Sequence, residues 1–367
     1  MKHLVMLGTG HAHVHLLSTL ATQPLAGVQI TLVAPYPHQF YSSMAPSFVA
    51  GHHALPDCVI SLEPYLKNTA VTWLQRSATA LDANAHIVTL DDGSTLHYDI
   101  LSLNSGPVLN KQKVEQMMPG AREHALFVLP LEPFGVLWPK VVALGQQKPL
   151  RVAIIGGNVT GFELACAVAH RLPASSVTLL NGDAQVGARY PSAVQSMLSQ
   201  ALKKRLITVI QEHVVGVTAG EVTLSSGARL ACDVPVIAID AQGPAWLQSS
   251  DLALDTEGFV AVDALQRSTS HPHVFAAVDV ATGVDLALPR GDIDAVRAAP
   301  AFSKNLRAVL VGVAPSPYTS QAKTLTLLSC GNRCAIASWG KWSAQGRWVW
   351  WLKDWLDRSF IDTYKKS

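Results

Sequence analysis

Two stretches of the sequence follow one pattern: an apolar segment, a glycine-rich turn and a helix-forming segment. They read HLVMLGTGHAHVHLLSTLA, with Gly8 and Gly10, and LRVAIIGGNVTGFELACAVAHRL, with Gly156, Gly157 and Gly161. A second apolar segment follows each of them, VQITLVAP and SVTLLNG. Strand, glycine turn, helix and strand form the βαβ unit that binds dinucleotides. Two such units in one chain constrain the fold far more than one glycine motif alone.

The first turn departs from the G-x-G-x-x-G pattern because His13 occupies the third glycine position. The turn is therefore a damaged nucleotide site, a metal site formed with His11 and His15, or a variant that still binds its cofactor. No cluster of cysteines or carboxylates nearby completes a zinc site, so we expect no metal. The third glycine mainly allows the helix to pack closely on the strand. We therefore expect Gly8, Gly10 and the helix N-terminus still to bind a pyrophosphate.

Composition narrows the class of protein. The chain has 367 residues with 28 basic and 26 acidic side chains, a net charge of +2. This length favours two domains or one large α/β assembly, and the balanced charge argues against a nucleic-acid partner. No apolar run reaches the roughly 18 residues of a membrane span, and the N-terminus has no secretory cleavage site. We expect a cytoplasmic protein, with the inner face of the cell membrane as an alternative location.

The order of elements predicts an internal duplication. Each βαβ unit precedes a meander and a returning strand, which end in DILSLNSG in the first half and in VPVIAID in the second. The segment HPHVFAAVDVATG predicts a strand ending at Asp279, followed by a helix over DIDAVRAAPAFSKNLRAVLVG. The fold class is thus α/β, with two Rossmann-like three-layer dinucleotide-binding domains. A C-terminal hairpin with its turn at Gly331 and Asn332 and an amphipathic helix follow.

The predicted C-terminal helix, within residues 347–366, has an aromatic and a charged face. At helical spacing the aromatic face carries Trp348, Trp351, Leu352, Trp355, Leu356 and Phe360. The opposite face carries Lys353, Asp354, Asp357, Arg358 and Asp362. The aromatic face either meets a membrane or partner surface or packs against the body of the chain or a homodimer seam.

Five cysteines without a C-x-x-C motif do not form a disulfide framework. Cys166 falls within the second βαβ helix, where core packing is the simpler interpretation. Cys330 and Cys334 flank the hairpin turn and would face each other. They form either a redox pair or two reduced thiols.

Several motifs together resemble a known family. They are GTGHAHVHLL, FYSSMAPSFVAGH, YDILSLNSG, VAIIGGNVTGFELA, HPHVFAAVDVA, AVRAAPAFSKNLRA and WLKDWLDRSFIDTY. The chain resembles the two-dinucleotide-domain flavoproteins of the FAD-dependent pyridine nucleotide-disulfide oxidoreductase superfamily, which include type II NADH dehydrogenases and sulfide:quinone oxidoreductases. Within it, the chain is most similar to the flavoprotein subfamily associated with selenide water dikinase. The resemblance implies an FAD-binding domain at 1–120 and 264–312, an NAD(P)-binding-like domain at 121–263 and a C-terminal segment at 313–367.

The resemblance also implies cofactor-binding positions. For FAD they are Gly8, Thr9, Gly10, His11, Ala12, His13, Ala34, Pro35, Tyr41, Ser42, Met44, Asn104, Ser105, Gly106, Asp279 and Arg290. Among these, the loop at 104–106 crosses the diphosphate or adenosine region, Asp279 holds the ribityl chain, and Tyr41 lies in the segment beside the isoalloxazine. For NAD(P)H they are Gly156, Gly157, Asn158, Gly161 and Glu163, the last on the nicotinamide side.

Some positions depart from the family pattern. Ala34 and Pro35 stand where a ribose-binding acid is expected, Val278 replaces a glycine, and Asp292 would oppose negative charge on a reduced flavin. In the second unit the ribose-binding acid is displaced to Asp183 or absent.

The activity implied is transfer of electrons from NAD(P)H through FAD to a quinone or similar small acceptor, with no side-chain nucleophile. Two alternatives stay open. One is a sulfide:quinone-type flavoprotein that does not use nicotinamide, and the other is a degenerate flavoprotein with a structural or regulatory role.

Overall fold

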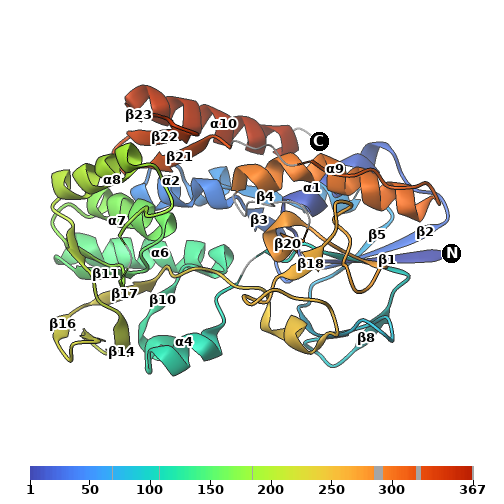
Figure 1. Cartoon of the computed structure of the whole chain (residues 1–367), viewed down its shortest axis with the longest axis horizontal. Coiled ribbons are helices and arrows are strands. Elements are labelled where there is room, and N and C mark those ends of the chain that lie inside the picture. The colour runs from blue at the N-terminus through green and yellow to red at the C-terminus, as the bar shows by residue number, and fades with distance from the viewer. Residues whose placement is uncertain (68, 107, 184, 285–291, 320–323, 366–367) are drawn as a thin grey trace.

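A computed structural model describes residues 1–67, 69–106, 108–183, 185–284, 292–319 and 324–365 and shows two five-stranded parallel sheets (Figure 1). The first has the order β19-β9-β1-β2-β5, formed by Val274–Ala276, Ile100–Leu103, Lys2–Leu7, Val28–Val33 and Val71–Leu74. The second has the order β10-β17-β11-β12-β13, formed by Leu126–Phe127, Val234–Ile237, Arg151–Ile155, Ser176–Leu180 and Thr208–Ile210. The predicted α/β class with two Rossmann-like sheets is confirmed.

The central strands are continuous apolar runs because both faces of each sheet are covered. In β1 the last four residues are buried, and Leu4 is level with Ile30 of β2 and Ile100 of β9. Helix α1 (His11–Thr22) follows β1, and helix α7 (Val159–Arg171) follows β11. Each sheet therefore carries its glycine turn at the carboxyl end of a central strand, where α/β proteins bind ligands.

Both halves have three layers. An antiparallel meander covers one face of each sheet: β6 (Ala78–Asp82), β7 (Ile87–Leu90) and β8 (Thr95–His97) in the first half, and β14 (Val214–Thr218), β15 (Glu221–Leu224) and β16 (Arg229–Ala231) in the second. Helices cover the other face, as Figure 1 shows above each sheet. After each meander the chain returns to the central strand, β9 beside β1 and β17 beside β11. The predicted duplication is confirmed.

The chain returns to the first half late in the sequence. The elements there are η3 (Ala245–Ser249), β18 (Val260–Val262), β19, η4 (Val278–Val280), β20 (Ala281–Gly283) and α9 (Asp292–Leu310), and α9 packs on α1. The predicted strand is shorter than expected, since it ends at Ala276 and Asp279 lies in the 3-10 turn η4. The domain boundary at 263 stays a prediction; Leu247 and Leu252 already pack in one cluster with Val5 and Leu101, which favours an earlier return.

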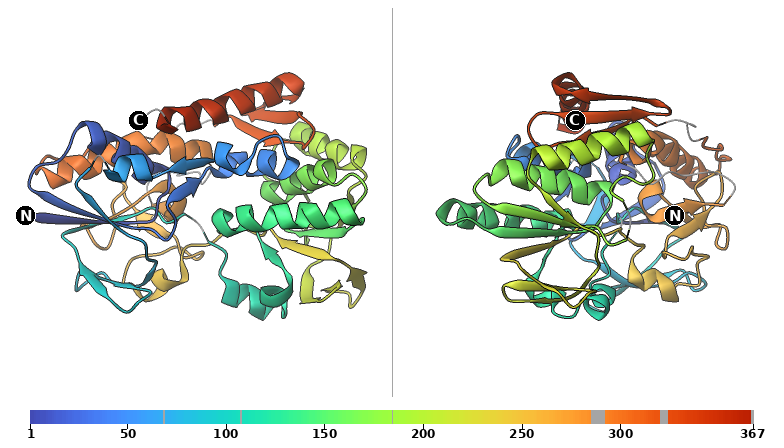
Figure 2. Two further views of the ribbon diagram at one scale, coloured as in Figure 1. Left: turned by 180° about the vertical axis from the view of Figure 1, so that it is seen from behind. Right: turned by 60° about the vertical axis from the view of Figure 1, so that its left-hand side comes forward.

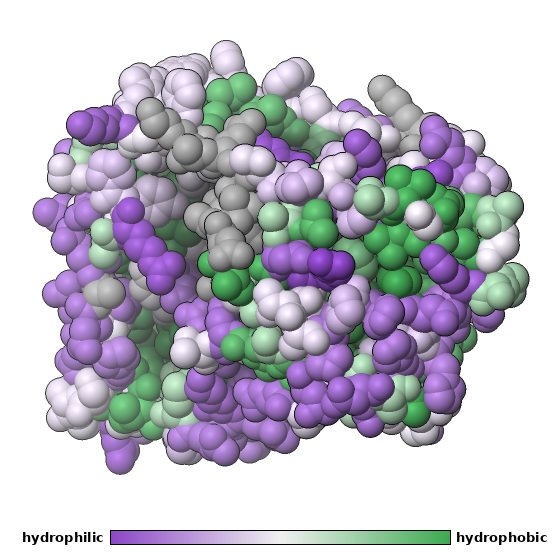
Figure 3. All heavy atoms as spheres, turned by 45° about the vertical axis from the view of Figure 1, so that its right-hand side comes forward, coloured by the Kyte–Doolittle hydropathy of each residue, from purple (hydrophilic) through white to green (hydrophobic). Residues whose placement is uncertain are grey.

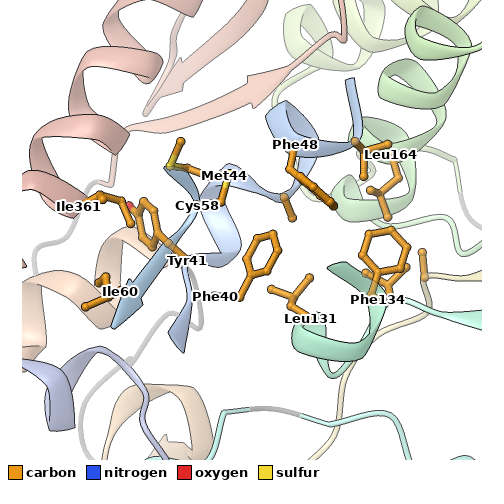
Figure 4. Packing of buried hydrophobic residues seen from close by; sticks show 14 of the residues in the cluster. Phe40, Tyr41, Met44, Phe48, Cys58, Ile60, Leu131, Phe134, Leu164 and Ile361 are labelled. Carbon is orange, nitrogen blue, oxygen red and sulfur yellow. The ribbon is translucent and has the colours of Figure 1, made fainter. Parts of the chain in front are cut away.

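The remaining elements lie between the strands within each half or between the two halves. They are β3 (His38–Phe40), η1 (Ser42–Met44), α2 (Ala45–Ala50), η2 (Leu55–Asp57), β4 (Val59–Ser61), α3 (Glu63–Lys67), α4 (Lys111–Met117), α5 (Ala121–His124), α6 (Leu131–Gln147) and α8 (Ser192–Lys204). Helix α2 packs on α7. Figure 4 shows the buried side chains running from Ile361 and Tyr41 through Phe40 and Phe48 to Leu164. A continuous apolar core thus joins the two nucleotide-binding units.

The C-terminal segment forms a separate layer. It contains the antiparallel strands β21 (Thr326–Ser329), β22 (Ala335–Trp339) and β23 (Trp342–Gly346) and helix α10 (Arg347–Lys365), so the predicted hairpin and helix are confirmed and a third strand is added. Figures 1 and 2 show this layer lying across the helices of both halves. In Figure 3 hydrophilic side chains dominate the lower part of the face shown, whereas hydrophobic and near-neutral side chains gather above. None of the helices within the described residues has the length and hydrophobicity that a membrane crossing requires.

Candidate functional site

The first glycine turn is closed by the loop that follows β9. Gly8 has a φ of +87°, and a Cβ there would lie 2.2 Å from the Cα of Ser105. A Cβ on Gly10 would lie 2.3 Å from Nδ2 of Asn104. The backbone N–H of Gly10 donates to the carbonyl of Asn104 at 2.8 Å. Only glycine fits at these two positions, because the crossing loop fills the space that any side chain would need.

His13 is a structural residue of this turn. Its Nδ1 lies 2.7 Å from the carbonyl oxygen of Gly8, and its Nε2 lies 2.6 Å from Oγ of Ser102. Since a carbonyl only accepts, Nδ1 carries the proton and Nε2 accepts from the Ser102 hydroxyl. Complete burial lowers the pKa of His13 to about 4, so the ring is neutral at pH 7. Both ring nitrogens are engaged within the protein, and His13 is therefore not a metal ligand.

Asn104 links the turn to the acidic residue predicted to hold the ribityl chain. Its Oδ1 accepts from the backbone N–H of His13 at 3.1 Å, and its Nδ2 donates to Oδ2 of Asp279 at 3.3 Å. The same carboxylate oxygen lies 3.9 Å from Nδ1 of His11. The structure thus brings Asn104 and Asp279, which lie far away in the sequence, to the turn that contains Gly8, Gly10, His11 and His13.

A small pocket adjoins these residues and contains a polar side chain that the sequence did not single out. Ala12, Asn104 and Asp279 line it together with Ala277, Val278, Gln266 and the α9 residues Ala295, Ala298, Ala299 and Phe302. Gln266 is 1 % exposed and has a φ of +62°, which is uncommon for a residue with a Cβ. Neither atom of its amide has a hydrogen-bond partner within the described residues. A buried amide without a partner is costly, and a ligand hydroxyl group would supply one.

These features fit the flavin dinucleotide that the resemblance implies. Helix α1 begins after Gly10, which has no side chain of its own to cap the helix. Asn104 accepts from the N–H of His13, so the N–H groups of His11 and Ala12 are the ones that can bind a diphosphate. The unpartnered amide of Gln266 can both donate to and accept from sugar or ribityl hydroxyls. His11 adds a second buried atom without a partner in the described part of the chain, its Nε2.

The segment predicted to lie beside the isoalloxazine is packed under helix α10. The Tyr41 ring stacks on Phe360 with centroids 4.6 Å apart, and the His11 ring lies 5.4 Å from each of them. Ser42 and Met44 follow in η1, where Met44 is buried. Figure 4 shows Tyr41 beside Ile361 of α10. The C-terminal helix therefore closes this side of the first unit.

The other predicted FAD positions of the first unit either contribute only backbone carbonyl groups or lie outside the described residues. At the end of β2, Trp73 Nε1 donates to the carbonyl of Ala34, and Gln75 Nε2 donates to that of Pro35. Ala34 and Pro35 supply no carboxylate for a ribose. Arg290 lies outside the described residues, and α9 begins at Asp292. A buried carboxylate, Asp294, was not predicted; it accepts from Thr324 Oγ1 at 2.8 Å, and burial raises its pKa.

The second glycine turn is close-packed but carries its own cap. A Cβ on Gly161 would lie 2.0 Å from the carbonyl oxygen of Gly156, so here the third glycine is needed. Oδ1 of Asn158 accepts from the N–H of Gly161 at 2.8 Å, and its Nδ2 donates to Asp240 at 3.0 Å. An asparagine cap of this kind uses one of the N–H groups at the helix N-terminus, where a diphosphate would bind.

Glu163 and Asp183 of the second unit bond to other protein groups, which argues against a simple contact with a ribose. Glu163 Oε1 accepts from the backbone N–H of Ser329 at 2.6 Å, which ties α7 to the C-terminal hairpin. Asn181 directly follows β12, where a ribose-binding acid is expected. Asp183 lies two residues further on and pairs with exposed His213 at 3.0 Å.

Helix α10 buries an ion pair together with apolar residues; its buried residues are Val349, Trp350, Lys353, Asp357, Ile361 and Tyr364. Lys353 and Asp357 are each 5 % exposed, whereas Trp348, Trp351 and Trp355 are 52–60 % exposed. Lys353 Nζ donates to the carbonyl and hydroxyl oxygens of Ser43 and to Asp357 Oδ2, at 2.7 to 2.9 Å. The buried ion pair thus anchors α10 to η1. Trp348, Trp351 and Trp355 do not pack against the described body of the chain, whereas Phe360 of the same predicted face does. A membrane or partner surface and a homodimer seam stay predictions for the tryptophans.

Comparison with known proteins agrees with this architecture. A family model described as pyridine nucleotide-disulphide oxidoreductase matches residues 2–299. An NADH dehydrogenase-like protein of Mycobacterium tuberculosis is 28% identical over 302 residues, which cover 77% of this chain and 73% of that protein. The ferredoxin--NAD(+) reductase component of a 3-phenylpropionate/cinnamic acid dioxygenase from Photorhabdus laumondii is 24% identical, covering 75% of this chain and 69% of its own.

Solved structures show the same fold. The sulfide:quinone oxidoreductase of Aquifex aeolicus superposes with a TM-score of 0.78 at 17% identity, covering 100% of this chain and 92% of its own. NDH2 of Plasmodium falciparum in complex with NADH gives a TM-score of 0.75 at 14% identity, covering 99% and 97%.

Proposed function

The chain belongs to the pyridine nucleotide-disulphide oxidoreductase family, and on that premise we propose that it is an FAD-dependent oxidoreductase that passes electrons from NAD(P)H to a quinone or similar small acceptor. The first turn carries the proposal: a glycine cradle closed by Asn104, a helix N-terminus that begins at Gly10, and a buried amide, Gln266, without a partner in the described chain. The link to selenide water dikinase stays a prediction based on the motifs alone.

Bound flavin would supply the capacity to accept a hydride and to deliver electrons one or two at a time. The chain would supply the binding groups. The N–H groups at the start of α1 would bind the diphosphate, and Gln266 and Asp279 would hold hydroxyls of the chain between diphosphate and ring. Tyr41, Phe360 and α10 would exclude water from the ring side of the site. His13 holds the glycine turn in shape and transfers no proton, because it is neutral and fully bonded.

NAD(P)H would bind at the second turn, with Glu163 on the nicotinamide side. One observation favours the alternative of a sulfide:quinone-type flavoprotein that does not use nicotinamide: Asn181, not an acid, directly follows β12, where a ribose-binding acid is expected. A degenerate flavoprotein with a structural or regulatory role is the third candidate, and the Val278 replacement supports it.

The exposed tryptophans support an electron acceptor that is dissolved in a membrane. Helix α10 presents Trp348, Trp351 and Trp355 outward, and Trp339 and Trp342 of the hairpin are 53 % and 49 % exposed. Aromatic side chains with basic residues nearby, such as exposed Arg358, are typical of helices that lie in the membrane interface. We therefore place the protein at the inner face of the cell membrane, with the tryptophan face of α10 and the hairpin on the lipid.

Flotation with vesicles containing anionic lipid tests this location. The unaltered protein should float, and Trp351→Ser/Trp355→Ser should not. Val136→Ser, which removes an exposed apolar side chain (60 %) of α6, is the matched control and should float. A protein that stays unbound but behaves as a homodimer, separated to monomers by the same tryptophan changes, would contradict the membrane surface in favour of a dimer seam.

Steady-state turnover with a short-chain quinone tests the activity. NADH or NADPH oxidation is the expected result, whereas turnover with sulfide and not with either nicotinamide would establish the second candidate. Gly10→Ala should lose both flavin and turnover, because its Cβ would meet Asn104. Gly216→Ala is the control, since a Cβ there meets only Thr223 at 3.6 Å. If the unaltered protein is folded but binds no flavin and shows no turnover, the third candidate, a degenerate flavoprotein, is the one that agrees with the result.

A further inference from the structure

Two thiols face each other across the turn of the C-terminal hairpin. Ser329 and Ala335 are register partners in β21 and β22, so Cys330 and Cys334 are the next opposed pair. The N–H of Cys330 donates to the carbonyl of Cys334 at 2.8 Å and closes the turn. Opposed residues of antiparallel strands have Cα atoms about 4.5 to 5.5 Å apart, within the range that a disulfide spans.

The turn is held firmly against the second nucleotide unit. A Cβ on Gly331 would lie 2.2 Å from the carbonyl oxygen of Cys166, so the turn packs directly on α7. The carbonyl of Gly331 accepts from His52 Nε2 at 2.7 Å, and Arg205 donates to Asn332. Anchors on both sides of the turn keep the two cysteines opposed whether or not they are bonded to each other.

The two thiols differ in exposure and electrostatics. Cys330 is fully buried, whereas Cys334 is partly exposed. A hydrogen bond from the Cys330 thiol, with Arg205, Gln345 and Lys204 nearby, outweighs desolvation and lowers the pKa of Cys334 to about 6. The same hydrogen bond and burial raise the pKa of Cys330.

Arg205 brings a positive charge to this turn: its guanidinium donates to Asn332, and its charge lowers the pKa of Cys334. Its Nε is buried without a hydrogen-bond partner among the described residues. A guanidinium with a free buried donor beside a partly exposed thiol stabilises the thiolate form. Cys166, the third thiol of the cluster, is fully buried in α7, and burial raises its pKa to about 12. It is therefore not the reactive group.

We propose that Cys330 and Cys334 form a dithiol site that exchanges with small-molecule disulfides and closes to an intramolecular disulfide. The Cys334 thiolate attacks a disulfide RSSR, forms a mixed disulfide and releases one thiolate RS⁻. Cys330 then gives up its proton and attacks the Cys334 sulfur, which releases the second RS⁻. The protein dithiol loses two electrons, and RSSR gains them as two thiols. The step needs neither the flavin nor a nicotinamide, so it is independent of the proposed function.

Glutathione disulfide added to the reduced full-length protein tests the proposal. Peptide mass mapping should show a Cys330–Cys334 bond without accumulated glutathione adduct. Cys330→Ser should stop at a glutathione adduct on Cys334, and Cys334→Ser should not react. Cys58 and Cys232 are internal controls, because both are buried and burial raises their pKa values, to about 12 and about 11. An adduct that persists on Cys334 of the unaltered protein, without the internal bond, overturns the proposal.

The pH dependence of alkylation gives a measurement that needs no variant. Iodoacetamide should modify Cys334 with a midpoint near pH 6, whereas an ordinary thiol has a midpoint of about 8.5. Arg205→Met should slow the reaction at pH 6.5 by roughly threefold, the effect of about one pKa unit on the thiolate fraction of a thiol with a pKa of about 6. A midpoint for the unaltered protein at the ordinary thiol value overturns the proposal.

Discussion

Replacement of Gln266 by methionine separates a ligand-binding amide from a structural one. Methionine has a similar size and shape, and it keeps the same penalty at a φ of +62°. Without ligand, the change removes a buried amide that has no partner in the described chain, which costs about 1–3 kcal/mol. The apoprotein should therefore become more stable. With FAD, the variant cannot form the hydrogen bonds that the amide offers, and the same 1–3 kcal/mol corresponds to binding weakened by roughly 5- to 150-fold.

Thermal unfolding of apoprotein and FAD-loaded protein, together with quenching of flavin fluorescence, measures both effects. The control is Asn305→Ala. Asn305 is equally buried, but its amide donates to the carbonyls of Leu265 and Ser316 and accepts from the N–H of Ser316. That change should lower the stability of both forms. The reasoning is refuted if Gln266→Met destabilises the apoprotein as Asn305→Ala does, or if it leaves FAD affinity unchanged.

Three further changes test the other parts of the account. His13→Gln should reduce acid sensitivity: a pKa of about 4 in the folded state against 6.5 unfolded makes stability fall by about 3 kcal/mol as the pH drops from 6.5 to 4, and urea unfolding of parent and variant measures the difference. Lys353→Met should cost about 3–5 kcal/mol in the same assay because it leaves Asp357 buried and unpaired, and adding Asp357→Leu should restore most of it. Asn158→Gly should tighten NADH binding roughly fivefold by calorimetry, the value of about one hydrogen bond freed for the diphosphate; unchanged affinity would contradict the competing cap.

Local patterns were enough to predict the layered fold. Glycine turns, apolar strand runs and the hairpin turn at Gly331 are short-range signals, and each half repeats them in one order. Those signals also predicted that Gly8, Gly10, Asn104 and Asp279 belong to one site, once the resemblance was taken into account. The end of the strand before Asp279 was misplaced, since Val278 to Val280 form a 3-10 turn although Val278 and Val280 are apolar.

The remaining features depend on contacts between distant segments. His13 is structural because its ring bonds to Ser102, which is distant in the sequence. Gln266 is a candidate ligand-binding residue because it is buried in the same pocket as Asp279. The sequence around His13 or Gln266 predicts neither contact. Helical spacing divided α10 only in part: Lys353 and Asp357 of the predicted charged face are buried, but Arg358 and Asp362 are exposed, and Phe360 of the predicted aromatic face packs on Tyr41. The burial of Lys353 and Asp357 depends on Ser43, a distant residue that bonds both.

The central claim is that the first turn holds a flavin that accepts electrons from a nicotinamide at the second. The most direct test is the visible absorption spectrum of the purified, FAD-loaded protein before and after anaerobic addition of NADH. The account predicts a flavin spectrum that bleaches within seconds on mixing. A flavin spectrum that remains oxidised with both NADH and NADPH would contradict it and would leave the second unit as a scaffold.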